Sequence, residues 1–157
     1  MSGLHLLVLL VHVLSAAVLF GAGAAIAFFM LTAHRTGDAR TVAQVARIVV
    51  LADFVFTATA VVVQPLSGGI LIVLGGHDPF APWLMAAYAL YVLVGACWLP
   101  VLAIQMRMRR LAEAAAAEGA ALPGAYHRLY RLWFALGWPA FAGVVAIYAL
   151  MLAKPFL

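Results

Sequence analysis

Four apolar runs, each long enough to cross a lipid bilayer, constrain this chain more than any other feature. They extend over residues of about 4–32, 42–74, 81–106 and 130–153, with a connector at about 107–129. A transmembrane helix needs roughly 20 mostly apolar residues. With 68% hydrophobic and 9% charged residues, the 157-residue chain leaves no room for a soluble domain. The sequence therefore predicts one all-α domain, a polytopic membrane four-helix bundle.

The arginines indicate how this bundle is oriented. Arg35, Arg40 and Arg47 flank the first connector, Arg107, Arg109, Arg110, Arg128 and Arg131 flank the third, and Lys154 alone lies on the other side. Cytoplasmic loops are enriched in such cations. We therefore expect both termini outside the cytoplasm, in a bacterial-type inner (plasma) membrane. The charge of +4 then reflects topology, so the expected partner is the lipid bilayer and not nucleic acid.

Three polar residues stand out within the apolar runs: His12, Asp53 and Gln64. Ionisable groups at membrane depth are costly and often mark a functional site. At about 1.5 Å per residue, His12 and Gln64 reach a similar depth in the outer leaflet. Tyr91 falls near the same level, and Lys154 lies above it. We expect His12, Gln64 and Tyr91 to form a polar layer in the outer half of the bundle, with Lys154 above it.

Asp53 lies deeper toward the cytoplasm on the second run. Eleven residues separate it from Gln64, close to three helical turns, so the two should share one polar stripe with Thr57 and Gly68. A buried carboxylate needs a partner or a proton. The candidate donors at its depth are Trp98, Trp138, Arg47 and Arg131. The sequence does not choose among them.

Each of these residues also has a purely structural interpretation. Polar side chains hydrogen-bond between membrane helices, which would account for His12 and for Asp53. Gln64 precedes Pro65, and its amide is a candidate partner for the carbonyl that the proline leaves free. A small-residue face of Ala17, Gly21 and Ala25 permits close helix approach, within the bundle or in a homodimer.

The chain has none of the common hydrolase, zinc-protease or phosphate-loop motifs, and its one cysteine, Cys97, excludes a multi-cysteine metal cluster. Cofactor chemistry requires fewer protein groups, because the cofactor carries the reaction. A membrane four-helix bundle with an inward histidine suits heme, whose iron takes a histidine ligand. Within this chain, no second interior histidine faces His12.

Several stretches, in order along almost the whole chain, carry a resemblance to a known family. They are HVLSAAVLFG (12–21), FFM (28–30), AHRTGD (33–38), AD (52–53), QPLSG (64–68), GACWLP (95–100), QMRMR (105–109), RLWFALGWP (131–139) and KP (154–155). The chain resembles the predicted integral membrane family known as domain of unknown function 2269. More remotely, its architecture is similar to copper-resistance protein D and to HemJ-type protoporphyrinogen oxidases.

The remote resemblance implies a heme b ligand or a copper site. His12 is the position that matches the first-helix histidine of the HemJ-type proteins, and the rest of that enzyme's pattern is not matched. Copper handling suits histidine and methionine ligands, but the sequence has no histidine-rich or Met-x-Met cluster.

Three hypotheses follow from the sequence. The first is a homodimeric b-type cytochrome with His12 as the metal ligand, in which Gln64, Tyr91 and Lys154 adjoin the heme. It would transfer electrons to, or sense, a redox partner, as a membrane heme oxidoreductase if it catalyses a reaction. The second is a proton- or cation-coupled transport component, copper included, that uses Asp53, Thr57 and Gln64. The third is a structural accessory membrane subunit.

Overall fold

The computed structural model describes residues 2–154, and within them the chain forms four long helical rods and no strand. The rods are α1 (Gly3–Thr36); α2 (Ala39–Ala52), η1 (Asp53–Thr57) and α3 (Ala58–Gly75), which continue into one another; α4 (Pro82–Glu118); and α5 (Gly124–Ala153). All four rods are long and apolar enough to cross a membrane. The prediction of an all-α architecture with four helices able to span a membrane is therefore confirmed. Each predicted span lies within one rod, except that Ala81 precedes α4.

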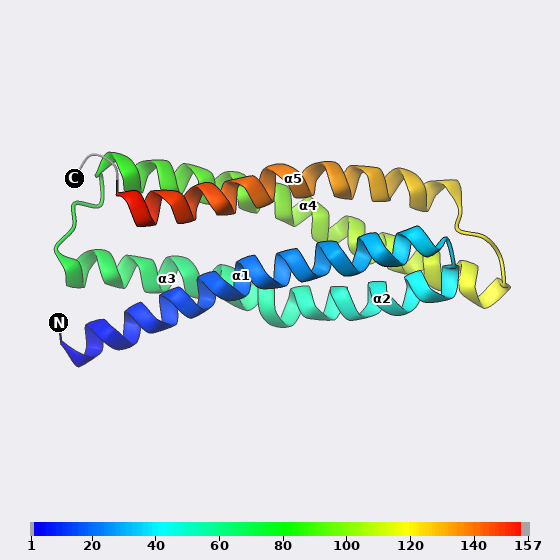
Figure 1. Cartoon of the computed structure of the whole chain (residues 1–157), viewed down its shortest axis with the longest axis horizontal. Coiled ribbons are helices and arrows are strands. Elements are labelled where there is room, and N and C mark those ends of the chain that lie inside the picture. The colour runs from blue at the N-terminus through cyan, green and yellow to red at the C-terminus, as the bar shows by residue number, and fades with distance from the viewer. Residues whose placement is uncertain (1, 155–157) are drawn as a thin grey trace.

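The rods run alternately up and down, so that the two ends of the described chain lie at the same end of the bundle (Figure 1). We call this the terminal end. The opposite end, which holds the α1–α2 turn and residues 119–123, carries eight of the nine cations and is called the arginine-rich end. Which end faces the cytoplasm stays a prediction from the positive-inside rule.

Local signals at the arginine-rich end explain the turn between α1 and α2. Gly37 ends α1 with a φ of 67°, a left-handed conformation that glycine adopts at little cost. Asp38 then caps α2 by accepting hydrogen bonds from the Thr41 amide at 2.8 Å and the Thr41 hydroxyl at 2.6 Å. The Thr41 hydroxyl and amide bonds lower the pKa of the Asp38 carboxyl below its ordinary value. A two-residue turn thus sets α1 antiparallel to the second rod.

The third and fourth rods extend beyond their predicted spans. α4 continues as a helix through the first part of the predicted connector and ends at Glu118, followed by Gly119 with a φ of 64°. α5 begins at Gly124, after Pro123. At its other end α5 stops at Ala153, where Lys154 has a φ of 38°. Pro155, which the sequence predicts to end this helix, lies outside the described residues.

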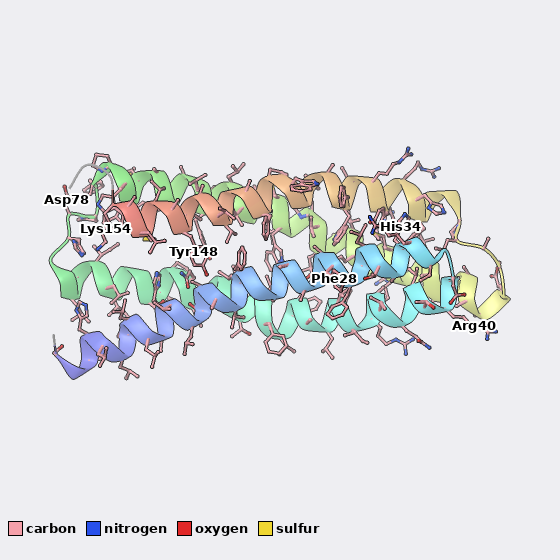
Figure 2. The ribbon with its side chains drawn as sticks, in the orientation of Figure 1. Phe28, His34, Arg40, Asp78, Tyr148 and Lys154 are labelled. Atoms are coloured by element: carbon pink, nitrogen blue, oxygen red, sulfur yellow. The ribbon has the colours of Figure 1, made fainter. Side chains whose placement is uncertain are left out.

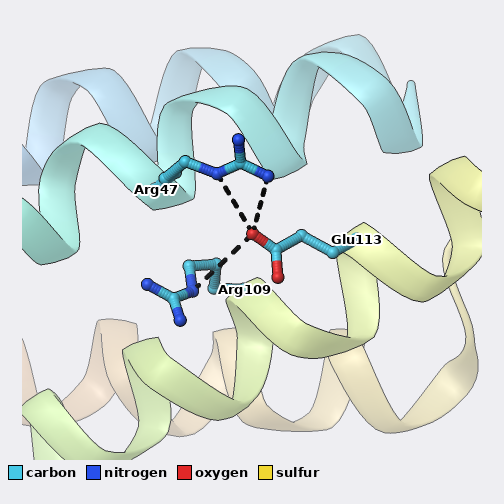
Figure 3. A network of polar contacts seen from close by, with 3 residues as sticks. All are labelled: Arg47, Arg109 and Glu113. Atoms are coloured by element: carbon cyan, nitrogen blue, oxygen red, sulfur yellow. Dashed lines mark hydrogen bonds and ion pairs between the residues drawn. The ribbon is translucent and has the colours of Figure 1, made fainter.

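The hydrophobic core lies at the arginine-rich end, where all four rods meet. Its fully buried members include Met30, Val42, Met108 and Tyr126, one from each rod. An ion pair on the surface joins the second rod to α4, because Arg47 and Arg109 both approach Glu113, at 3.1 and 3.8 Å (Figure 3). These side chains are partly exposed, so their contribution to stability is small.

Toward the terminal end the bundle separates into two helix pairs. α1 packs against α3 and α4 packs against α5, whereas α3 makes no comparable packing contact with either α4 or α5. The two pairs diverge visibly in Figure 1. Most large apolar side chains in this half, such as Leu10 and Leu152, are exposed on the isolated chain and would face lipid. The terminal half therefore depends more on contacts within each pair than on a shared core.

Candidate functional site

The polar residues of the terminal half converge between α1 and α3. The His12 Nδ1 atom lies 2.9 Å from the Ser67 hydroxyl, and the His12 Nε2 atom lies 3.3 Å from the Gln64 amide nitrogen. The Ser15 hydroxyl donates to the Gln64 amide oxygen. We call these four residues the His12 cluster. The predicted proximity of His12 and Gln64 is thus confirmed, while Ser15 and Ser67 are members that the sequence reasoning missed.

A glycine permits the close packing of the histidine ring. A Cβ atom at Gly68 would lie 3.2 Å from His12 Cε1, which is tighter than most real contacts of this kind. Ser67 and Gly68 therefore act as a pair: one hydrogen-bonds the ring and the other leaves room for it. Gly68 therefore lies beside His12, and its predicted place on the same face as Gln64 has this steric reason.

The hydrogen bonds assign one tautomer to His12. The Ser67 hydroxyl donates its hydrogen to the Val63 carbonyl at 2.7 Å, so its oxygen is free to accept from the ring. His12 Nδ1 then carries the hydrogen and donates to Ser67. Nε2 retains its lone pair and accepts from Gln64, whose amide orientation is set by Ser15. This assignment is inferred from the network, and it presents a neutral imidazole whose Nε2 is available as a ligand or a proton acceptor.

A second polar group surrounds Asp53 nearer the arginine-rich end. Asp53 is only 3% exposed, and its Oδ2 accepts a hydrogen bond from the Gln105 amide at 2.6 Å. Its Oδ1 accepts a longer bond from the Trp98 indole at 3.4 Å, and the Gln105 carbonyl oxygen accepts from the Trp133 indole at 2.8 Å. We call these residues the Asp53 network. It joins the second rod to α4 and α5.

Of the predicted donors to Asp53, only Trp98 contacts it in the structure. Trp138 is 63% exposed and Arg47 is paired with Glu113 instead; Arg131 lies on the surface groove described below. The sequence reasoning missed the main donor, Gln105, because it lies at the end of its apolar run, two residues before Arg107. A polar residue at that position is expected to lie at the membrane interface. No signal in the sequence identifies it, because a polar residue at the edge of a span gives no indication of whether it points into the bundle.

Asp53 and Gln64 do not form the single stripe that their spacing predicts. The partners of Asp53 are on α4 and α5, while those of Gln64 are on α1. The cause lies between them: residues 53–57 form the π-helical turn η1, in which the Ala58 amide bonds to the Asp53 carbonyl. Such a turn inserts one extra residue, and so changes the phase of the helix by roughly 100°.

Thr57, at the end of η1, is buried, and its hydroxyl has no hydrogen-bond partner among the described residues. In a regular helix a threonine hydroxyl commonly bonds the carbonyl four residues earlier. The π turn alters that geometry. A buried polar atom without a partner is unusual and is a position at which water is expected.

Tyr91 bonds the backbone carbonyl that Pro65 leaves free, a role that was predicted from the sequence for Gln64. Pro65 has no amide hydrogen, which leaves the Val61 carbonyl without its helical partner. The Tyr91 hydroxyl, on α4, donates to that carbonyl. The structural interpretation of Gln64 is therefore wrong in this respect, because its amide bonds to His12 and the carbonyl is satisfied by Tyr91.

Lys154 lies at the terminal end, near Asp78 and far from His34 and Arg40 (Figure 2). Its ammonium group stands 5.9 Å from the centre of the Trp83 ring, in the range of a cation–π contact. The structure therefore keeps Lys154 at the edge of the bundle, as predicted from depth. Among the described residues, no group of three or more histidine, cysteine or acidic side chains could hold a metal ion.

The family comparison covers nearly the whole chain. Residues 6–155 match the model of a family described as predicted integral membrane protein, domain of unknown function 2269. No curated protein and no solved structure matches the chain. The match identifies a family of membrane proteins and supplies no reaction, ligand or partner.

Proposed function

The chain belongs to this predicted integral membrane family, and we propose that it binds heme b in its terminal half, with His12 as the axial ligand. One observation carries the proposal: Ser67 holds His12 Nδ1–H, which leaves Nε2 with its lone pair as the coordinating atom, engaged only by the long 3.3 Å bond from the Gln64 amide. Histidines that ligate metals commonly donate their other N–H in this way. Electron transfer or redox sensing is the function that such a heme would serve.

The residues around His12 fit this group. The two helix pairs make few contacts with one another in the terminal half, and most of the large side chains there are apolar, as an apolar macrocycle requires. The bond from Gln64 to Nε2 is long, at 3.3 Å, so the amide can be displaced at small cost. Tyr91 and Lys154 lie on the facing pair, and the Lys154 ammonium is a candidate partner for a propionate. When bound, the heme supplies one-electron redox chemistry.

A single protein ligand is expected. Of the five histidines, His12 alone lies deep within a predicted span. His5 lies at the very start of the first span, His77 is near the terminal end, and His34 and His127 are near the arginine-rich end. We therefore propose a heme with one protein ligand, which would be high-spin and open to external ligands.

The test is a reduced-minus-oxidised absorption spectrum of detergent-purified protein, expressed with heme supplementation, with iron analysis on the same sample. His12→Ala should abolish the b-type spectrum. His5→Ala, a substitution of the same kind two turns away on α1, should leave it unchanged and serves as the matched control. Full heme content in the His12 variant, or a featureless spectrum of the unaltered protein, would refute the assignment.

A proton or cation path through Asp53 is the second candidate. It is favoured by the Thr57 hydroxyl one turn away, which has no hydrogen-bond partner in the described part of the chain. A carboxylate and an unsatisfied hydroxyl on a π turn can hold a water molecule, and π turns are frequent at functional sites. Asp53→Asn should then abolish proton-coupled or cation flux, copper included, into proteoliposomes. Asp78→Asn, in the terminal-end loop, is the control. Normal flux in the Asp53 variant would reject this path.

The proposal includes a bacterial-type inner membrane, with the arginine-rich end in the cytoplasm, and a homodimer. The small residues Ala17, Gly21 and Ala25 are exposed on α1, which leaves that face open to a second copy. An accessory subunit is the remaining alternative, and it predicts neither heme nor flux but a stable membrane partner.

A further inference from the structure

A groove with no acidic residue opens at the arginine-rich end, between the end of α1 and the start of α5. It has a volume of about 520 Å³. The residues that line it are His34, Gly124, His127, Arg128, Tyr130 and Arg131. We call it the basic groove. It is separate from the His12 cluster, which lies in the other half of the bundle. His34, one of its lining residues, is labelled in Figure 2.

Within residues 2–154, the arginines of this groove form no ion pair with an acidic side chain. The ion pairs among the described residues join Glu113 to Arg47 and Arg109, on the second rod and α4. Arg128 and Arg131 take part in none of them. The α5 N-terminus adds to the positive potential, because its cap residue, Pro123, supplies no side-chain hydrogen bond to the free amides of the first turn. The groove is thus an uncompensated positive site.

Aromatic contacts fix the inner wall of the groove. The His34 ring stacks on Tyr130 with ring centres 3.6 Å apart and meets His127 edge-on at 5.6 Å. The Tyr126 hydroxyl lies 3.4 Å from His34 Nδ1. Tyr130 is 7% exposed, and its hydroxyl is buried with no hydrogen-bond partner among the described residues. The wall therefore combines ordered rings with an unsatisfied polar atom.

An apolar track leaves the groove toward the middle of the bundle. Tyr130, Phe134 and Trp138 follow one another every four residues on α5, with ring centres 6.2 and 6.0 Å apart. Phe134 and Trp138 are 41% and 63% exposed, so this face of α5 is open to lipid. Residues four apart share a helix face. A positive groove at the membrane surface thus leads directly into an aromatic surface within the membrane.

We propose that the basic groove binds the phosphate headgroup of an anionic membrane lipid, whose acyl chain lies along Phe134 and Trp138. Arg128 and Arg131 contact the phosphate oxygens. Arginine suits this role because its planar group donates several hydrogen bonds to a phosphate. Basic pockets at the cytoplasmic ends of membrane helices are a recognised class of headgroup site. A soluble phosphate would use the same arginines but would gain nothing from the aromatic track.

The test is native mass spectrometry of the full-length protein in detergent, titrated with phosphatidylglycerol, phosphatidylcholine or inorganic phosphate. The variant R128Q/R131Q removes two charges from the groove. The control R107Q/R110Q removes two exposed charges at the same end of α4, outside the groove. A third variant, F134A/W138A, alters the track alone.

We expect the unaltered protein and the control to prefer phosphatidylglycerol over phosphatidylcholine by about tenfold or more, since each basic group contributes about 1 kcal/mol. R128Q/R131Q should lose this preference, and F134A/W138A should weaken both lipids. An unchanged preference in R128Q/R131Q, or an equal loss in the control, would overturn the groove as the site. Inorganic phosphate that competes as well as the lipid, with no effect of F134A/W138A, would overturn the lipid as its ligand.

Discussion

Gln105 is the residue whose removal should damage the fold most specifically. It is 1% exposed, and it bridges Asp53 and Trp133 through bonds of 2.6 and 2.8 Å. Gln105→Leu keeps the volume similar but leaves the Trp133 N–H and the Asp53 Oδ2 without partners. Asp53 retains only the 3.4 Å contact with Trp98.

The size of the effect follows from these two lost bonds. An orphaned buried donor costs about 1–3 kcal/mol, and a bond to a carboxylate is worth about 1.5–3 kcal/mol. Single polar contacts between membrane helices contribute only about 0.6 kcal/mol on average and at most about 1.7. The smaller values for contacts between membrane helices reduce the sum of the two lost bonds. We therefore expect Gln105→Leu to reduce the free energy of unfolding by about 2–3 kcal/mol.

The assay is reversible unfolding in mixed micelles of increasing SDS content, followed by tryptophan fluorescence. Gln44→Leu, at an exposed position of α2, is the matched control and should stay within about 0.5 kcal/mol. A double-mutant cycle isolates the mechanism. Trp133→Phe removes the orphaned N–H, so adding it to Gln105→Leu should recover about 1 kcal/mol relative to the sum of the single variants. Additive single effects, or a Gln105 variant as stable as the control, would refute the reasoning.

Two further predictions concern helix packing. Tyr91→Phe should lower the free energy of unfolding by about 1 kcal/mol, because it leaves the Val61 carbonyl without its hydrogen-bond donor. The loss should be much smaller in a Pro65→Ala background, where the backbone amide of residue 65 can bond to that carbonyl. Equal losses in both backgrounds would contradict this explanation. Gly143→Ala places a Cβ 2.6 Å from the Val94 Cγ2 atom, so SDS unfolding should show a loss of about 1–3 kcal/mol, and Val94→Ala should restore most of it.

The sequence predicted the depth of the polar residues along the bundle better than the helix face on which each of them lies. Helical rise alone brought His12 to the level of Gln64, and the structure places the two side chains in contact. The same arithmetic put Asp53 on the face of Gln64, which is wrong because the π turn rotates one half of the rod against the other. Nothing in residues 53–57 by themselves signals that turn, because phenylalanine, valine and threonine are equally compatible with a regular helix in a membrane span.

Short polar residues escaped the sequence reasoning for a different reason. Serine is common in membrane helices, where its hydroxyl can bond a backbone carbonyl of the same helix, as Ser15 and Ser67 do. A serine in an apolar run therefore does not by itself indicate a functional site. Their role depends on the facing helix. Trp133 and Gln105 were missed likewise, because a residue at the edge of a span gives no indication of whether it points inward.

A substitution of Gln64 distinguishes the two roles proposed for the His12 cluster, which are helix packing and heme binding. In lipid, helices gain little from apolar burial, so α1 and α3 are held together in part by the Gln64 contacts to Ser15 and His12. Gln64→Leu removes both contacts and should lower the stability of the protein toward SDS. If His12 binds heme through Nε2, the same variant removes the group that competes for this atom, so heme content should equal or exceed that of the unaltered protein. A folded Gln64→Leu variant without heme would show that the amide belongs to the heme site itself, because its loss could then not be explained by helix packing.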